Sequence, residues 1–152
     1  MTTPKATIQR LNPLELRDEF VARIARLNLN SGGILSVNVD ILPRGKPTMT
    51  QASKWNNRNQ DYLKGYCPIV LSAFNRLTKF ETCRAIQVIS LFPTDNPKLL
   101  GQIYDKKPDA SNILKGVEDI LIRLDQRIGF AESLKMYDTH PGLMITLVGP
   151  ED

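Results

Sequence analysis

Residues 82–92, with the sequence TCRAIQVISLF, constrain the fold of this chain more than any other segment. They are rich in β-branched and apolar side chains, and they end at Pro93, which cannot donate a ladder hydrogen bond. A short apolar run of this composition is typical of a strand in the centre of a sheet. The rest of the chain must therefore supply the neighbouring strands and the helices that cover them.

Two further segments show strand patterns. In residues 34–42 (ILSVNVDIL) apolar side chains alternate with polar ones, which predicts a half-buried strand. Residues 142–148 (GLMITLV) predict a final strand, whereas residues 127–137 are ambiguous between strand and helix. The sheet is therefore expected to be small.

Three segments carry apolar side chains at helical spacing. Residues 13–27 follow Asn12, which can cap a helix, and residues 61–77 contain Pro68, which must kink the helix or begin a new one. A third helix is expected from Asn112 onward. Strands and helices interleaved in this way predict one compact domain of the α/β (α+β) class, with a small mixed sheet flanked by helices.

The composition is that of a globular protein without a membrane segment. Of 152 residues, 41% are hydrophobic and 24% are charged, and no apolar run reaches the roughly 18 residues that a membrane-spanning helix needs. The N-terminal sequence MTTPKATIQR lacks the apolar core of a secretory signal, so a soluble, cytoplasmic protein with no membrane partner is expected. Cys67 and Cys83 lie in apolar surroundings and are expected to be buried free thiols.

A basic segment follows the first predicted strand. Residues 44–64 carry five cations against one acid, and the whole chain has a net charge of +4. Cations beside aromatic side chains suit contact with nucleic-acid phosphates and stacking on an exposed base, for which Trp55 is the candidate. The alternative is a solvated loop, with Trp55 in the core. The candidate phosphate-binding side chains are Arg44, Lys46, Lys54 and Arg58.

Residues 107–119 (KPDASNILKGVED) admit two interpretations. As an ordinary helix start, Asp109, Ser111 or Asn112 caps the first free amides. As a metal-dependent site, carboxylates hold Mg²⁺ for phosphodiester cleavage, and Lys115 stabilises the charge that builds on phosphorus. The residue types fit the second chemistry, but a capped helix fits the same spacing.

The same stretch resembles the motif of the RusA-type Holliday junction resolvases, a family of Mg²⁺-dependent homodimeric endonucleases. The family motif runs P/R-D-x-D-N-(L/I)-x-K-x-x-x-D-x-L, followed by D-D-x-x-(V/I), a lysine and a strand similar to G-x-x-I-T-I. The residues in register with it are Asp109, Asn112, Ile113, Lys115, Asp119, Leu121, residues 124–128 (LDQRI), Lys135 and residues 141–147 (PGLMITL). The resemblance covers about residues 34–148.

This resemblance implies a RusA-like endonuclease domain over residues 31–152, preceded by an N-terminal helical extension over residues 1–30. The implied activity is the resolution of four-way DNA junctions by paired cuts, and a C2 homodimer would match the near two-fold symmetry of the junction. The implied catalytic residues are Asp109, Lys115 and Asp125, with Asp109 and Asp125 as ligands of Mg²⁺ or Mn²⁺, and the implied DNA contacts also include Lys107 and Asn112.

The sequence departs from the family motif at three points. Ser111 stands where the motif has its second aspartate, Leu124 replaces the first acid of the D-D pair, and the interval between the two halves is shorter. Glu118, on the same helical face as Ser111, is a further candidate metal ligand. Glu132 is expected to be a solvated side chain, and His140 a residue of a surface turn.

Two alternatives stay open beside the nuclease. The chain could keep the fold and the DNA affinity while its metal site has decayed, which would make it a catalytically impaired branched-DNA-binding protein; Ser111 favours this interpretation. It could also be an unrelated small α/β protein in which residues 107–124 are simply a capped helix.

Overall fold

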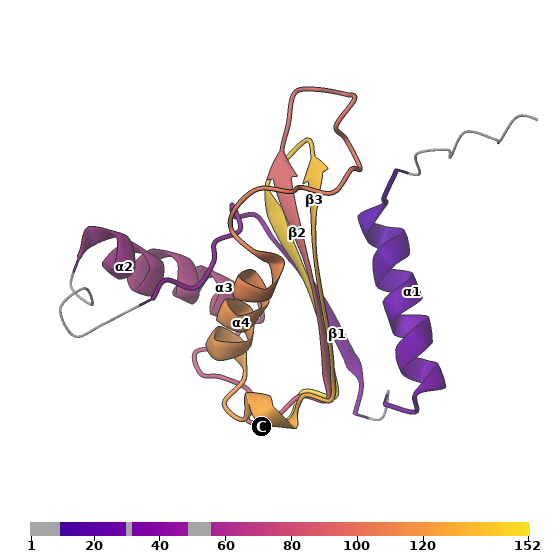
Figure 1. The fold of residues 1–152 in the computed structure, drawn as a ribbon. Helices are drawn as coiled ribbons and strands as arrows, with labels where there is room; N and C mark the ends of the chain where they lie inside the picture. Colours follow the sequence, from indigo (N-terminus) through magenta and orange to yellow (C-terminus); the bar gives the residue numbers. More distant parts are fainter. Residues whose placement is uncertain (1–9, 30–31, 49–55) are drawn as a thin grey trace, which may run out of the picture.

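The computed structural model describes residues 10–29, 32–48 and 56–152. A four-stranded mixed sheet carries helices on both of its faces, which confirms the predicted α+β architecture (Figure 1). The elements, in chain order, are α1 (Pro13–Arg26), β1 (Ile34–Val39), α2 (Asn57–Asp61), the π-helix η1 (Tyr62–Tyr66), α3 (Cys67–Ser72), β2 (Ala85–Pro93), α4 (Ala110–Leu121), the 3₁₀ turn η2 (Asp125–Arg127), β3 (Phe130–Asp138) and β4 (Gly142–Val148).

The sheet has the strand order β1-β4-β2-β3. β2 pairs parallel with β3 and antiparallel with β4, and β4 pairs antiparallel with β1. β2 therefore lies in the interior of the sheet, as its apolar sequence predicts, and nearly all of its residues are buried. β1 is an edge strand. The sequence predicts that it is half-buried, but its side chains are more exposed than that, and Val39 alone among them is buried.

Some boundaries differ from the sequence prediction. Residues 127–137, which the sequence leaves ambiguous, fall largely in β3, an edge strand whose mostly intermediate burial hides any clear period. β1 ends at Val39 rather than at residue 42. Pro68 begins a new helix, because α3 follows η1 directly and a proline in the first turn needs no hydrogen-bond donor.

The larger core lies between the sheet and the helices η1, α3 and α4. Alternate side chains of β2, including Ile86 and Val88, face Ile113 and Val117 of α4 across this core. Burying an aliphatic side chain of this kind stabilises the fold by about 1.5–3 kcal/mol. The amphipathic helix predicted from Asn112 onward is confirmed, and its apolar face fixes α4 against the sheet along its length.

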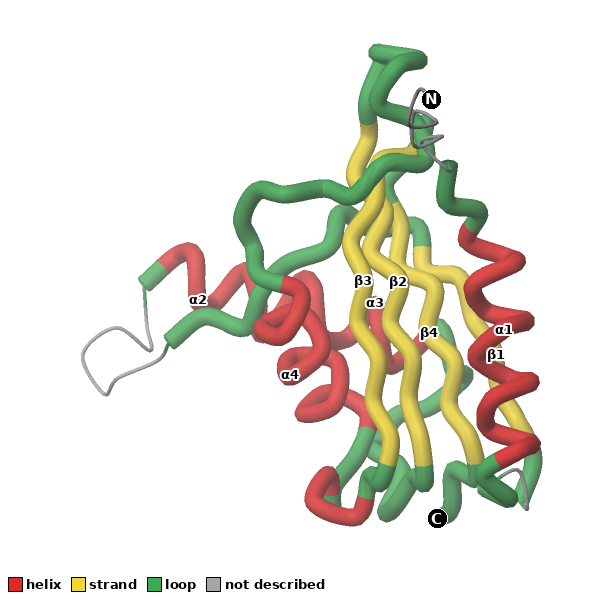
Figure 2. Tube along the Cα trace, turned by 45° about the vertical axis from the view of Figure 1, so that its right-hand side comes forward, coloured by secondary structure: helices red, strands yellow, loops and turns green. Residues whose placement is uncertain are grey.

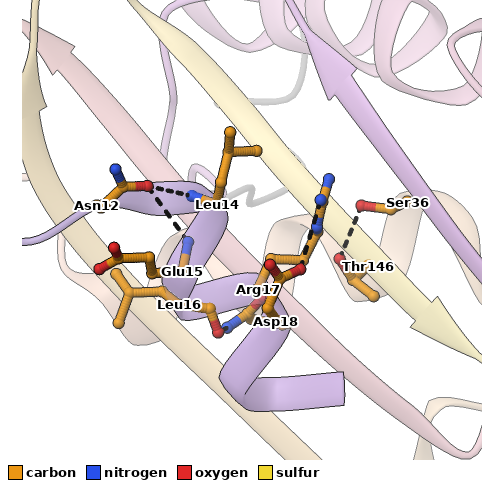
Figure 3. Close-up of polar contacts among 9 residues, drawn as sticks. Asn12, Leu14, Glu15, Leu16, Arg17, Asp18, Ser36 and Thr146 are labelled. Atoms are coloured by element: carbon orange, nitrogen blue, oxygen red, sulfur yellow. Dashed lines mark hydrogen bonds and ion pairs between the residues drawn. The ribbon is translucent and has the colours of Figure 1, made fainter. Parts of the chain in front are cut away.

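Helix α1 begins where the sequence predicts. The Oδ1 atom of Asn12 accepts hydrogen bonds from the backbone nitrogens of Leu14, at 3.0 Å, and Glu15, at 3.3 Å (Figure 3). These bonds satisfy amides that a helix start leaves without an intrahelical partner. Asn12 is therefore the N-cap of α1, with Pro13 at the first helical position.

α1 covers the face of the sheet opposite α4 (Figures 1 and 2). Phe20 and Ile24 are fully buried there against Ala85 of β2 and Val148 of β4. The Phe20 ring lies 5.8 Å from the ring of Phe130, measured between centroids. α1 is thus a layer of the folded body; whether residues 31–152 fold without it stays a prediction.

Candidate nucleic-acid interface

Two polar side chains of β3 hold the start of α4. Ser133 Oγ donates a hydrogen bond to the carbonyl oxygen of Ala110 at 2.7 Å. Lys135 Nζ donates to the carbonyl oxygen of Pro108 at 2.8 Å and also to that of Lys106. The family motif contains a lysine at the place of Lys135, and here that lysine fixes the loop that leads into α4. Sequence reasoning gave Ser133 no part in the site.

The basic segment after β1 is docked onto the same end of α4. Asn112 Nδ2 donates to the carbonyl oxygen of Lys46 at 3.1 Å, and the backbone nitrogen of Lys46 donates to the carbonyl oxygen of Asn112 at 3.4 Å. Gly45 permits this approach, because a Cβ atom there would lie 2.6 Å from Asn112 Nδ2 and 3.0 Å from Pro108 Cβ. Asn112, a predicted DNA contact, therefore positions the basic segment.

An open pocket of about 470 Å³ lies where these segments meet. Within the described part of the chain, every residue predicted to bind DNA lines it. These residues are Arg44, Lys46, Arg58, Lys107 and Asn112, and Asp109 lines the pocket with them. Lys54 and Trp55 lie outside the described residues. The fold thus gathers cations from the β1–α2 connection, α2 and the loop before α4 into one place.

The cations of the pocket differ in how they are paired. Arg44 Nη1 lies 2.7 Å from Asp61 Oδ2, and Lys46 is ion-paired with Asp119. Arg58 and Lys107 are exposed and form no ion pair with the residues that the structure describes. The first turn of α4 adds the positive end of a helix dipole to the same pocket. Arg58 and Lys107 are therefore the cations most available to an incoming anion.

Arg44 is fixed by two tyrosines. Its guanidinium carbon lies 5.6 Å from the ring centre of Tyr62 and 5.9 Å from that of Tyr66. Its backbone nitrogen donates to Tyr66 Oη at 3.2 Å. Burial raises the pKa of Tyr66 to about 12, so the phenol stays neutral at physiological pH. The Arg44 charge is thus held at the pocket by stacking as well as by Asp61.

The two aspartates predicted to share a metal ion lie at opposite ends of α4. Asp109 is the N-cap residue, and Asp125 follows the last helical residue, Leu121. The 12 residues of α4 span roughly 18 Å. Ligands of one Mg²⁺ ion must each approach to about 2.0–2.1 Å. Asp125 turns back toward the middle of α4, where it lies near Lys115, and the shared Asp109–Asp125 metal site stays a prediction.

The third candidate ligand and the candidate catalytic lysine lie away from the Asp109 end. Lys115 Nζ is 4.0 Å from Asp125 Oδ2. Burial, and after it the negative charge of Asp125, raise the pKa of Glu118, while the charge of Lys115 opposes this shift. Glu118 therefore belongs with Lys115 and Asp125, and it does not complete a site at Asp109. No group of three or more His, Cys, Asp or Glu side chains in the described ranges is placed to hold a metal ion.

Two further carboxylates, those of Glu132 and Asp119, form ion pairs that join separate parts of the fold. Glu132 was expected to be solvated, but its Oε1 accepts from Arg23 at 2.5 Å and its Oε2 accepts from Gln87 Nε2 at 2.7 Å. It links β3 to α1 and to the centre of the sheet, so that expectation is wrong. Asp119, in register with the motif, pairs with Lys46 across the edge of the pocket.

The remaining polar candidates behave as expected. His140 is exposed in the turn between β3 and β4. Cys67 and Cys83 are free thiols; Cys83 is buried and Cys67 partly so. Burial is the largest influence on both thiols and raises the pKa of each. Neither cysteine lines the basic pocket.

Comparisons with known proteins gave no match to a family model, to a curated protein or to a solved structure. The resemblance to the RusA-type resolvases therefore depends on the motif residues themselves. None of the helices described is both long enough and apolar enough to cross a bilayer.

Proposed function

We propose that this chain binds the phosphate backbone of DNA through the basic pocket at the start of α4, with four-way junctions and other branched DNA as the substrate class. One observation carries the proposal: the predicted DNA-binding residues within the described ranges converge on that pocket although they come from separate parts of the sequence. The branched-DNA preference comes from the motif resemblance alone.

The charges of the pocket support backbone binding. Arg58 and Lys107 are exposed, form no ion pair within the described ranges and lie beside the first turn of α4. Two such cations that neutralise DNA phosphates would release the counterions condensed on the DNA, which makes binding salt-dependent. The pocket is open and polar, as contact with a nucleic-acid strand requires.

Cleavage of the junction is the second candidate function. Asp109 favours it, because its carboxylate is exposed in the pocket and makes no capping hydrogen bond within the described part of the chain. The separation of Asp109 from Asp125 opposes it within one chain. The homodimer that the resemblance implies would offer a second arrangement, in which Asp109 of one copy and Asp125 of the other serve one active site.

Binding is tested with a fluorescein-labelled four-way junction and a linear duplex of equal length, by fluorescence anisotropy between 50 and 200 mM NaCl. We expect tighter binding to the junction than to the duplex. In the Arg58→Ala/Lys107→Ala variant, the negative slope of log affinity against log salt concentration should become less steep by roughly 2, about 0.9 for each lost phosphate contact. Arg26→Ala, which removes an exposed cation of α1, is the control. An equal effect of Arg26→Ala, or no binding at 50 mM salt, would refute the proposal.

Asp109 and Asp125 separate the two candidate functions. Asp109→Asn removes a negative charge from the pocket and should raise DNA affinity by up to about fivefold, whereas Asp125→Asn should leave it unchanged. The same proteins are incubated with the junction and Mg²⁺ or Mn²⁺. Cutting by the wild type that both substitutions abolish would select the nuclease, and tight binding without cutting would select the binding protein.

A further inference from the structure

A second, larger concavity adjoins the basic pocket, because Lys46 lines both of them. It is a groove of about 810 Å³ between η1, α3 and α4, and it is lined mainly by apolar side chains. Leu63, Ile69 and Leu77 are exposed at it by 39%, 48% and 96%. Large apolar side chains that cluster at a groove mark an interaction surface more often than single scattered ones do.

The groove has the form of a protein-binding site. Its volume lies within the range of about 300–1,000 Å³ for small-molecule pockets, but such pockets bury most of the ligand and carry converging polar groups. This groove is open, and its walls are the continuous η1–α3 segment and α4. An open apolar channel between helices is the usual receptor for an amphipathic helix, which places apolar side chains in the channel and polar ones toward solvent.

The charged residues around the groove favour a negatively charged partner. From residue 62 to residue 80 the chain carries three cations, Lys64, Arg76 and Lys79, and no carboxylate. Asp119, which lines the groove from α4, is paired with Lys46, and Arg76 is paired with Asp152. Lys79 is exposed and forms no ion pair with the residues described.

The positive charge also reaches the interior of the groove. Cys67 lies in its lining, and the charges of Arg44 and Lys79 both favour the thiolate form of this residue, although burial outweighs them.

We propose that this groove binds an amphipathic helical segment of a partner protein, with large apolar side chains on one face and carboxylates beside them. The apolar side chains would enter the channel between α3 and α4 and cover Leu77 and Ile69. The carboxylates would lie beside Lys79, which lines the groove. Arg58 and Lys107 do not line this groove, whereas Lys46 lines both the groove and the basic pocket.

The test is a selection of random 15-residue peptides displayed on phage against the full chain, with counter-selection on the Leu77→Asp variant. The best peptide is then measured by fluorescence anisotropy. We expect a selected pool enriched in acidic residues and in leucine-like residues at helical spacing. Leu77→Asp and Lys79→Glu should each weaken binding at least tenfold, and Leu14→Asp on α1, also at an exposed leucine, should change it less than twofold.

Three results would overturn the proposal. The first is a pool without acidic enrichment, or binding that Lys79→Glu does not weaken. The second is a dimer in sedimentation velocity that Leu77→Asp converts to a monomer, because the groove would then be covered by a second copy of this chain. The third is loss of peptide binding in the presence of a saturating DNA junction together with loss of DNA affinity in Leu77→Asp, because the groove would then belong to the DNA interface.

Discussion

Gly45→Ala tests the contact that builds the basic pocket. The new Cβ would lie 2.6 Å from Asn112 Nδ2, so the amide must move and its hydrogen bond to the Lys46 carbonyl must break. The lost bond costs about 1 kcal/mol, and the forced shift of close-packed atoms adds about 1–3 kcal/mol. Lower entropy of the unfolded chain returns about 0.4–1 kcal/mol. We therefore expect the free energy of unfolding to fall by about 1–3 kcal/mol.

A double-mutant cycle shows whether the loss arises at this contact. In the Asn112→Ala background the side-chain amide is absent, so Gly45→Ala should cost about 1–2 kcal/mol less than in the wild type. Urea denaturation followed by circular dichroism measures all four proteins, and DNA anisotropy measures the pocket. Gly129→Ala is the control, because its Cβ would meet only the Arg84 carbonyl, at 3.8 Å. A cost below about 0.5 kcal/mol, equal in both backgrounds, would refute the docking of the basic segment on α4.

Three further predictions concern the rest of the fold. Phe20→Ala should lower the free energy of unfolding by about 3–5 kcal/mol, because this side chain is fully buried, whereas Leu14→Ala on the same helix should cost under about 1 kcal/mol; urea denaturation compares them. The raised pKa of Glu118 means that the folded state holds this proton more tightly than the unfolded state. Stability should therefore fall as pH rises from the ordinary pKa of 4.5 through the raised one, and Glu118→Gln should remove this fall in thermal melts across that range. Lys135→Met should free the loop 106–109, seen as faster hydrogen exchange there, since it removes two hydrogen bonds to that loop.

Local patterns were enough to predict most of the fold. The apolar run that forms β2, the cap at Asn12 and the helical spacing that forms α4 each reflect burial or backbone chemistry within a few residues. β3 was not predicted, because its residues are mostly half-buried and alternate weakly. Its parallel pairing with β2 depends on the α4 crossover between them, which no local pattern encodes.

The site was predictable only in part. The basic segment and the motif both pointed to residues that line one pocket. Their docking could not be read from the sequence, because Lys46 and Asn112 are 66 positions apart. The pairing of Lys46 with Asp119 joins residues 73 positions apart and was missed for the same reason. The placement of Asp109 before the helix and Asp125 after it, however, was implicit in the predicted helix between them.

The surroundings of helix α4 differ chemically between its start and its later turns. At its start, Arg58 and Lys107 surround one exposed carboxylate, that of Asp109. Further along the helix, Lys115 and the half-buried Glu118 accompany Asp125. A phosphate held in the basic pocket therefore meets cations and Asp109, and the roles that the motif resemblance assigns to Lys115 and Asp125 apply to a different place on the surface. The proposed DNA binding therefore rests on the start of α4, and the proposed hydrolysis needs Asp125 from beside its later turns.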